Sequence, residues 1–170
     1  MENALERIKR DFSHRNLDPE KYDDYFFLRF LRARKFDVDK STLMLNNYFK
    51  WREEFGTDDI YSYAFPEVFE VKKCYPHGYH KTDKYGRSIY IERIGQLDIK
   101  RLFEVTSADR MFKYFVREYE RLIQDRMPAA SEAAGVRIDT SLCILDMEGI
   151  SMKMATSEVM NFVKQASSIA

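Results

Sequence analysis

The chain has 170 residues, in which 28 Lys and Arg side chains balance 28 Asp and Glu side chains. A net charge of zero argues against nucleic acid as a partner, because nucleic-acid-binding domains carry an excess of basic residues. The apolar fraction is ordinary and 15% of the residues are aromatic, which indicates a folded chain with a large core or apolar cavity and excludes disorder.

The cellular compartment follows from cysteine usage and from the lack of targeting signals. Cys74 and Cys143 lie far apart in the sequence and form no disulfide framework, so a reducing compartment is expected. The amino terminus, "MENALERIKRDF", has no apolar core of a secretory signal. No stretch reaches the roughly 20 apolar residues that a membrane-spanning helix needs. We therefore expect a cytoplasmic protein.

Apolar residues recur at helical spacing in three successive segments of residues 1–56. Asp37 is a typical N-cap for the third segment, and Gly56 is a typical stop after it. We therefore predict a three-helix unit over residues 1–56, followed by a connector over residues 57–75. The predicted apolar stripes are Leu5, Ile8 and Phe12; Phe27, Phe30 and Leu31; and Met44, Leu45, Tyr48, Trp51 and Phe55.

The periodicity changes in residues 76–170, which predict an α/β sheet domain. "GYHKTDKYGRSIYIERIG" predicts two strands about a turn at residues 83–86, and "TSAD" at residues 106–109 predicts the start of a long helix that ends before Pro128. "TSLCILD", at residues 140–146, predicts a buried, parallel strand. A last helix is predicted from about Ala155, with Val159, Met160, Val163 and Ala166 as its stripe.

Three cations, Arg32, Arg34 and Lys35, lie at the end of the second predicted helix. Positive charge there stabilises the free carbonyl groups by about 0.3–1 kcal/mol, which explains the cluster without any ligand. The same residues suit a phosphate site, since Arg offers a planar fork and Lys a point charge. The pattern by itself leaves both interpretations open.

Two further clusters invite a chemical interpretation. Cys74, His77 and His80 resemble part of a zinc site, but a structural zinc needs four ligands, so packing and hydrogen bonding explain them better. Carboxylates near residues 139–148, including Asp146 at a strand end, invite acid–base chemistry. No nucleophile motif or glycine-rich phosphate loop accompanies them, and turn capping is the better account. We expect no enzyme, no cofactor and no metal.

Several motifs together, in the order of the chain, resemble a known family. "LRFLRARKFDVDKS" and "YFKWREEFG" resemble the helical amino-terminal unit of CRAL-TRIO proteins. "YPHGYHKTDKYGRSIYIERIG", "VTSADRM", "SEAAGVRIDTSLCILDMEGIS" and "VKQASSIA" resemble the fungal-type phosphatidylinositol/phosphatidylcholine transfer proteins. The resemblance implies a helical amino-terminal unit followed by the first part of a CRAL-TRIO lipid-binding α/β sheet, truncated at the carboxyl end.

The resemblance also implies a function without covalent chemistry. One phospholipid would lie in an apolar cavity, and phosphatidylinositol would be exchanged for phosphatidylcholine at a transiently contacted membrane, in support of phosphoinositide signalling and Golgi secretion. Arg34 and Lys35 match the basic pair that helps to hold the inositol phosphate. Tyr79 and Ser141 match positions that contact the phosphocholine headgroup, and Cys143 stands where relatives have a threonine.

Other departures from the family leave alternatives open. Ala170 stands where relatives have a serine, and the family's lipid fold, with its closing helix, continues beyond residue 170. An unpaired sheet edge would let a second copy of the chain bind, giving a homodimer. The alternative to lipid transfer is a non-transferring interaction or regulatory module, which binds a partner or an anionic membrane surface through the helical unit.

Overall fold

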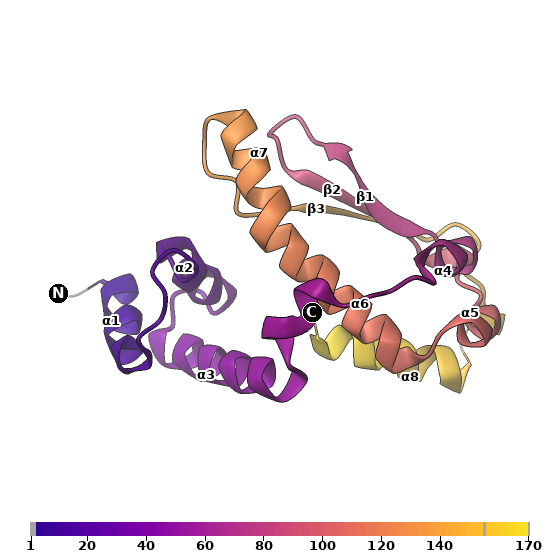
Figure 1. Ribbon diagram of the computed structural model, residues 1–170, viewed down its shortest axis with the longest axis horizontal. Helices are drawn as coiled ribbons and strands as arrows, with labels where there is room; N and C mark the ends of the chain where they lie inside the picture. Colours follow the sequence, from indigo (N-terminus) through magenta and orange to yellow (C-terminus); the bar gives the residue numbers. More distant parts are fainter. Residues whose placement is uncertain (1–2, 155, 170) are drawn as a thin grey trace. The chain divides into compact units, whose positions relative to one another are not determined.

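The computed structural model describes residues 3–154 and 156–169 (Figure 1). The chain divides into two compact units, Met1–Asp58 and Asp59–Ala170, which are described separately. Ala155, near which the last helix was predicted to begin, and Ala170 lie outside the described residues.

The first unit contains the three predicted helices, α1 (Ala4–Asp11), α2 (Asp24–Ala33) and α3 (Val38–Phe55), with a short 3-10 turn at Ser13–Arg15 after α1. Each helix begins at a side chain that accepts a backbone N–H of its first turn. These caps explain why short helices start where they do. The N-caps are Asn3, Asp23 and Asp37, and the buried core is Ile8, Phe12, Phe27, Phe30, Leu31 and Leu45.

The end of α3 has the chemistry that its sequence predicts. Gly56 has φ of +72°, a left-handed conformation that side chains with a Cβ adopt at a cost, and its N–H donates to the carbonyl of Arg52. The buried Arg52 guanidinium donates to Asp58 (2.7 Å) and to the Tyr48 hydroxyl (3.0 Å). Leu45 is buried, whereas Tyr48 is only partly buried, so the predicted α3 stripe is less enclosed than expected.

The second unit is built on a sheet of three described strands, β1 (His77–Thr82), β2 (Ser88–Arg93) and β3 (Leu142–Asp146), in the order β1-β2-β3. β1 and β2 are antiparallel, and β2 and β3 are parallel. The helices are α4 (Val68–Cys74), α5 (Ile99–Val105), α6 (Ala108–Arg121), α7 (Met127–Ala134) and α8 (Ser157–Ile169), with short 3-10 turns at Thr57–Ser62, Ile94–Gln96 and Met152–Met154. A helical unit followed by part of an α/β sheet agrees with the predicted fold class.

The third strand is parallel, as predicted, but it is not buried. Ile144 is 44% exposed, Leu145 is 52% exposed, and Cys143 is exposed as well. Among the described residues β3 has β2 as its neighbour on one side only. The prediction of burial was wrong because an apolar run indicates what suits a central strand, whereas burial also needs layers over both faces of the sheet and a neighbour on the second edge.

The predicted end of the long helix before Pro128 was also wrong. α6 ends at Arg121, a π-helical turn covers Leu122–Arg126, and α7 then carries Pro128 in its first turn. A proline lacks the N–H that an interior position would need, but first-turn N–H groups have no partner within the helix. The wider π turn therefore lets the helical path continue past Pro128 (Figure 1).

One face of the sheet is covered by α6 and α8. The Phe162 ring of α8 is 4% exposed and lies 5.5 Å from the Phe112 ring of α6, between centroids. Phe162 was not among the predicted α8 stripe, and two members of that stripe, Met160 and Val163, are exposed. The opposite face carries Ile91 and Ile144, whose side chains remain partly or largely accessible.

Candidate functional site

A row of three side chains crosses the sheet on the face covered by α6 and α8. Tyr79 of β1 is paired with Tyr90 of β2, and Tyr90 is paired with Cys143 of β3. Side chains of directly opposed residues share a face, so all three point to the same side. The Tyr79 and Tyr90 ring centroids are 5.1 Å apart. The structure thus brings two predicted site residues, Tyr79 and Cys143, together around Tyr90, which the sequence reasoning missed.

The π turn adds a cation to this row. The Arg126 guanidinium lies 4.4 Å from the centroid of the Tyr79 ring, a cation–π distance. Arg126 also lies 3.4 Å from a carboxylate oxygen of Glu118, about two turns earlier on the helical path. π turns occur frequently at functional sites, because the extra residue re-aims the side chains around it. Arg126 was not predicted as a site residue. The sequence signal near it is Pro128, which indicates that the helix is locally irregular there.

The tyrosines of this face are neutral hydrogen-bonding groups. Burial raises the pKa of Tyr79 to about 12, despite the opposing effect of Arg126. Burial, followed by the nearby Glu92 carboxylate, raises the pKa of Tyr90 further above its ordinary value. Both phenols therefore keep their protons at neutral pH and can donate to a phosphate or a carbonyl oxygen, while their rings offer apolar and cation-binding faces.

The cavity on this face is small. It measures about 80 Å³ and is lined by Tyr75, Tyr90, Glu92, Phe115, Tyr119 and Ala166. The Tyr75 hydroxyl donates to the Glu92 carboxylate, and Ala166 belongs to α8, so that helix closes one side. Ligand pockets for drug-sized molecules measure about 300–1,000 Å³. With α8 in this position, the cavity is too small for a ligand of that size.

Of the remaining predicted residues, Ser141 lies next to the row, two residues before Cys143, and the others belong to the first unit. Ser141 immediately precedes β3 and is exposed. Arg34 and Lys35 belong to the first unit, where Arg34 caps the end of α2 and donates to the carbonyl of Ala33 (3.1 Å). Lys35 and Phe36 have φ of 52° and 63°, a left-handed conformation that is strained for residues other than glycine. Both predicted cations are exposed, so the helix-end interpretation is realised and an anion can still reach them.

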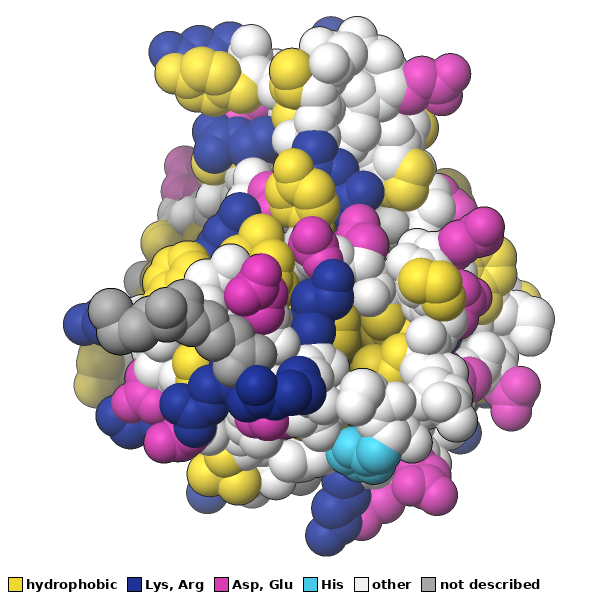
Figure 2. Space-filling view, turned by 90° about the vertical axis from the view of Figure 1, so that its left-hand side faces the viewer, with side chains coloured by type: hydrophobic (Ala, Val, Ile, Leu, Met, Phe, Trp, Pro, Cys, Tyr) yellow, Lys and Arg dark blue, Asp and Glu magenta, His cyan; other side chains and the backbone are white. Residues whose placement is uncertain are grey.

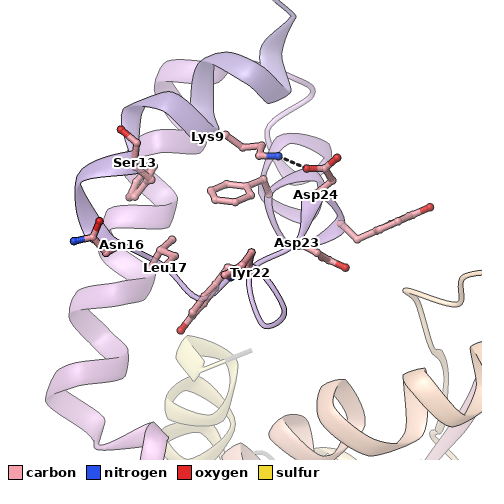
Figure 3. A pocket seen from close by; sticks show the side chains of 11 residues that line it. Lys9, Ser13, Asn16, Leu17, Tyr22, Asp23 and Asp24 are labelled. Carbon is pink, nitrogen blue, oxygen red and sulfur yellow. Dashed lines mark hydrogen bonds and ion pairs between the residues drawn. The ribbon is translucent and has the colours of Figure 1, made fainter.

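A larger cavity, of about 550 Å³, lies in the first unit between α1 and α2 (Figure 3). Its walls combine apolar and aromatic side chains, such as Leu17 and Tyr22, with polar ones, such as Asn16. The ion pair of Lys9 with Asp24 crosses its rim. Neither Arg34 nor Lys35 lines it. The predicted anion site and this cavity are therefore separate features of the helical unit.

The described residues do not form the arrangement that a metal site or an acid–base pair would need. No group of three or more His, Cys, Asp or Glu side chains within the described ranges could hold a metal ion. Burial lowers the pKa of His77 to about 4, so the ring is neutral and its Nδ1 bonds the carbonyl of Tyr75 (2.8 Å). Asp146 accepts the backbone N–H of Glu148 (3.0 Å) and pairs with Arg93 (3.1 Å). These are turn-capping and pairing roles.

The surface charges are mixed. Figure 2 shows Lys and Arg side chains together with Asp and Glu side chains among the described residues of the face that it draws. Among the helices that the structure describes, none has the length and apolar character needed to cross a membrane.

Comparison with known families decides the classification. The model of the CRAL/TRIO domain matches residues 72–170, and that of the CRAL/TRIO N-terminal domain matches residues 4–47. The chain belongs to the CRAL/TRIO family. The resemblance found in the sequence motifs is thereby confirmed, and the fold agrees with it: the crystal structure of Sfh5 matches with a TM-score of 0.61 at 20% identity, over 88% of this chain and 50% of that one.

Two curated relatives show where in the CRAL/TRIO family the chain lies. It is 45% identical over 151 residues to the SEC14 cytosolic factor of Kluyveromyces lactis, covering 88% of this chain and 50% of that protein. It is 44% identical over 156 residues to the phosphatidylinositol/phosphatidylcholine transfer protein SFH4 of Arabidopsis thaliana, covering 91% of this chain and 26% of that protein. This CRAL/TRIO chain therefore spans half or less of the length of these two relatives.

Proposed function

We propose that this CRAL/TRIO chain is the headgroup-binding part of a phosphatidylinositol/phosphatidylcholine transfer protein. The carrying observation is the row of Tyr79, Tyr90 and Cys143 on one sheet face, with Arg126 above Tyr79. The name of the SFH4 relative supports the choice of lipids. The proposed setting is cytoplasmic, with transient membrane contact that supports phosphoinositide signalling and Golgi secretion.

The row supplies the groups that a phosphocholine headgroup requires. A quaternary ammonium is attracted to the faces of tyrosine rings, here those of Tyr79 and Tyr90. The headgroup phosphate takes charge-assisted hydrogen bonds from Arg126 and a hydroxyl hydrogen bond from Ser141. Cys143, at the β3 end of the row, is a weak donor, so we expect weaker phosphate binding than a threonine would give.

For phosphatidylinositol we propose Arg34 and Lys35 as contacts of the inositol phosphate. Both are exposed, and Lys35 is held in a left-handed conformation next to Phe36. The left-handed conformation of Lys35 belongs to the cap of α2, because the N–H of Phe36 donates to the carbonyl of Leu31 (2.7 Å). The exposure of both cations is the observation in this chain that supports a role beyond capping α2.

The acyl chains supply most of the binding free energy in this proposal. Each CH₂ group moved from water into an apolar site contributes about 0.8 kcal/mol. The 80 Å³ cavity cannot hold an acyl chain, so lipid uptake requires α8 to leave the sheet face and uncover Phe115. No covalent step is needed, and the proposed function is not enzymatic.

The test is transfer of fluorescent phosphatidylcholine and phosphatidylinositol between donor and acceptor vesicles. We expect transfer to fall in Tyr90→Ala for phosphatidylcholine and in the double variant of Arg34→Gln and Lys35→Gln for phosphatidylinositol. Met160→Ala on the exposed side of α8 is the matched control. The wild-type chain could instead show no transfer and bind anionic vesicles in a way that moderate salt abolishes. That result would contradict this proposal and support the non-transferring module, the alternative that the small cavity favours.

A further inference from the structure

Two lysines lie at the β1–β2 turn, Lys81 at the end of β1 and Lys84 in the turn itself, and Lys81 has an unusual backbone conformation. Between the pairs Tyr79–Tyr90 and Thr82–Ser88, β1 has one more residue than β2, so this is a β-bulge. Lys81 in the bulge has φ of 57°. Bulges re-aim side chains and bend the strand that contains them. Lys81 and, in the turn itself, Lys84 are exposed, and neither forms an ion pair with a described carboxylate.

The turn residues around these lysines are firmly held. The Asp83 carboxylate accepts the backbone N–H groups of Tyr85 and Arg87, both at 2.9 Å, and pairs with the Arg87 guanidinium (2.6 Å). Asp83 is thus occupied internally and does not neutralise the lysines. Tyr85 follows them in the turn and is 60% exposed, with Lys84 4.9 Å from its ring centroid. The turn therefore presents an aromatic ring and two cations on a rigid frame.

The turn lies beside the end of α7 (Figure 1). A Cβ added to Gly86 would come within 3.3 Å of the Ala134 Cβ, so the two segments touch. Between them runs a groove of about 510 Å³ with small apolar side chains along it, and Val136, just after α7, is 62% exposed. We define the tip surface as Lys81, Lys84, Tyr85 and Val136. Residues 81–87 and 130–137 contain four cationic and two anionic side chains.

We propose that the tip surface docks this unit on an anionic membrane surface. The inference rests on the function proposed above, since lipid exchange requires contact with a bilayer. Tyrosine is enriched at membrane interfaces, and cations are attracted to anionic lipids. The charges are flexible lysines, which suit a fluid layer of many lipid phosphates better than they suit one phosphate held in a fixed fork. The exposed Val136 and the small groove residues add apolar contact.

Sedimentation with vesicles tests the proposal on the full chain. Vesicles of phosphatidylcholine alone are compared with vesicles that also contain phosphatidylserine. The double variant of Lys81→Gln and Lys84→Gln is expected to bind the anionic vesicles roughly 10- to 30-fold more weakly, since each lysine near the surface contributes about 1 kcal/mol. Tyr85→Ser is expected to weaken the binding that remains at high salt, where charge effects are screened.

The control variant removes the same number of positive charges from another part of the second unit. The double variant of Lys100→Gln on α5 and Lys113→Gln on α6 alters two exposed lysines away from the turn. It is expected to bind like the wild-type chain, and far-UV circular dichroism checks that every variant is folded. Equal losses in both double variants would overturn the proposal, because net charge alone would then explain them. The proposal would also be overturned if the wild-type chain did not bind anionic vesicles, whether or not it bound an acidic protein.

Lipid content separates this proposal from the function on which it rests. Native mass spectrometry of the tip variant is expected to show the same bound phospholipid as the wild-type chain, because the tip residues do not line the sheet face. A wild-type chain that binds no phospholipid but docks through Lys81 and Lys84 would defeat the transfer function and leave the docking surface standing.

Discussion

Phe162→Ala perturbs the packing that closes the proposed headgroup face. The ring is 4% exposed and lies within 6.4 Å of four other aromatic rings, between centroids. Removing a buried phenylalanine ring costs about 3–5 kcal/mol, through lost transfer free energy and the cavity that remains. We expect a value near 3 kcal/mol, because α8 has exposed Met160 and Val163 on its other side and can shift to fill part of the space.

The assay is urea unfolding followed by far-UV circular dichroism, with Val163→Ala as the matched control. Val163 is 43% exposed on the same helix, so its loss is expected to cost under about 1 kcal/mol. Equal free energies of unfolding for the two variants would refute the reasoning, since Phe162 would then not anchor α8. The enlarged cavity should also increase binding of a small apolar probe, which Val163→Ala should not do.

Three further predictions concern charge, strain and the headgroup row. Hydrogen bonding, chiefly from Arg110, lowers the pKa of Glu67 from its ordinary value of 4.5 to about 2. Its contribution to stability is therefore complete above pH 4.5 and is lost as the pH falls through 2. Glu67→Gln should therefore lower the free energy of unfolding at pH 7 by about 1–2 kcal/mol and flatten its dependence on pH below 4.5; an unchanged acid profile would contradict this. Lys35→Gly should raise thermal stability by about 1 kcal/mol, because glycine tolerates φ of 52°, while weakening phosphatidylinositol binding in vesicle assays; a less stable variant would disprove the strain. Cys143→Thr should increase the bound phosphatidylcholine seen by mass spectrometry, because a hydroxyl donates better than a thiol; an unchanged or lower lipid content would argue against contact with the phosphate.

Features that depend on neighbouring residues in the sequence could be predicted well. Asp37 and Gly56 cap α3 as expected, because capping requires only a side chain or a φ value within one turn. The turn at residues 83–86 follows from Asp83, whose carboxylate binds two backbone N–H groups nearby. The resemblance to the CRAL/TRIO family was predictable because several motifs occur in the same order.

Features that depend on strand register or on what packs against a strand could not be predicted. Tyr90 joins the headgroup row only because β2 pairs with β1 and β3 in one particular register, which periodicity does not determine. Arg126 reaches Tyr79 because of a π turn. Pro128 indicates that the helix is irregular near this point, but it does not determine that the irregularity is a π turn. The apolar sequence of β3 predicted burial, but the exposed fraction of Ile144 depends on whether another layer covers its face of the sheet.

The central claim is that this CRAL/TRIO chain holds a phospholipid headgroup at Tyr79 and Tyr90. Native mass spectrometry tests it most directly, with the chain purified from cells that contain both phosphatidylinositol and phosphatidylcholine. We expect a folded chain with one phospholipid mass per copy, and loss of the phosphatidylcholine species in Tyr90→Ala but not in Met160→Ala. A folded, lipid-free wild-type chain, or equal lipid content in all three proteins, would contradict the account.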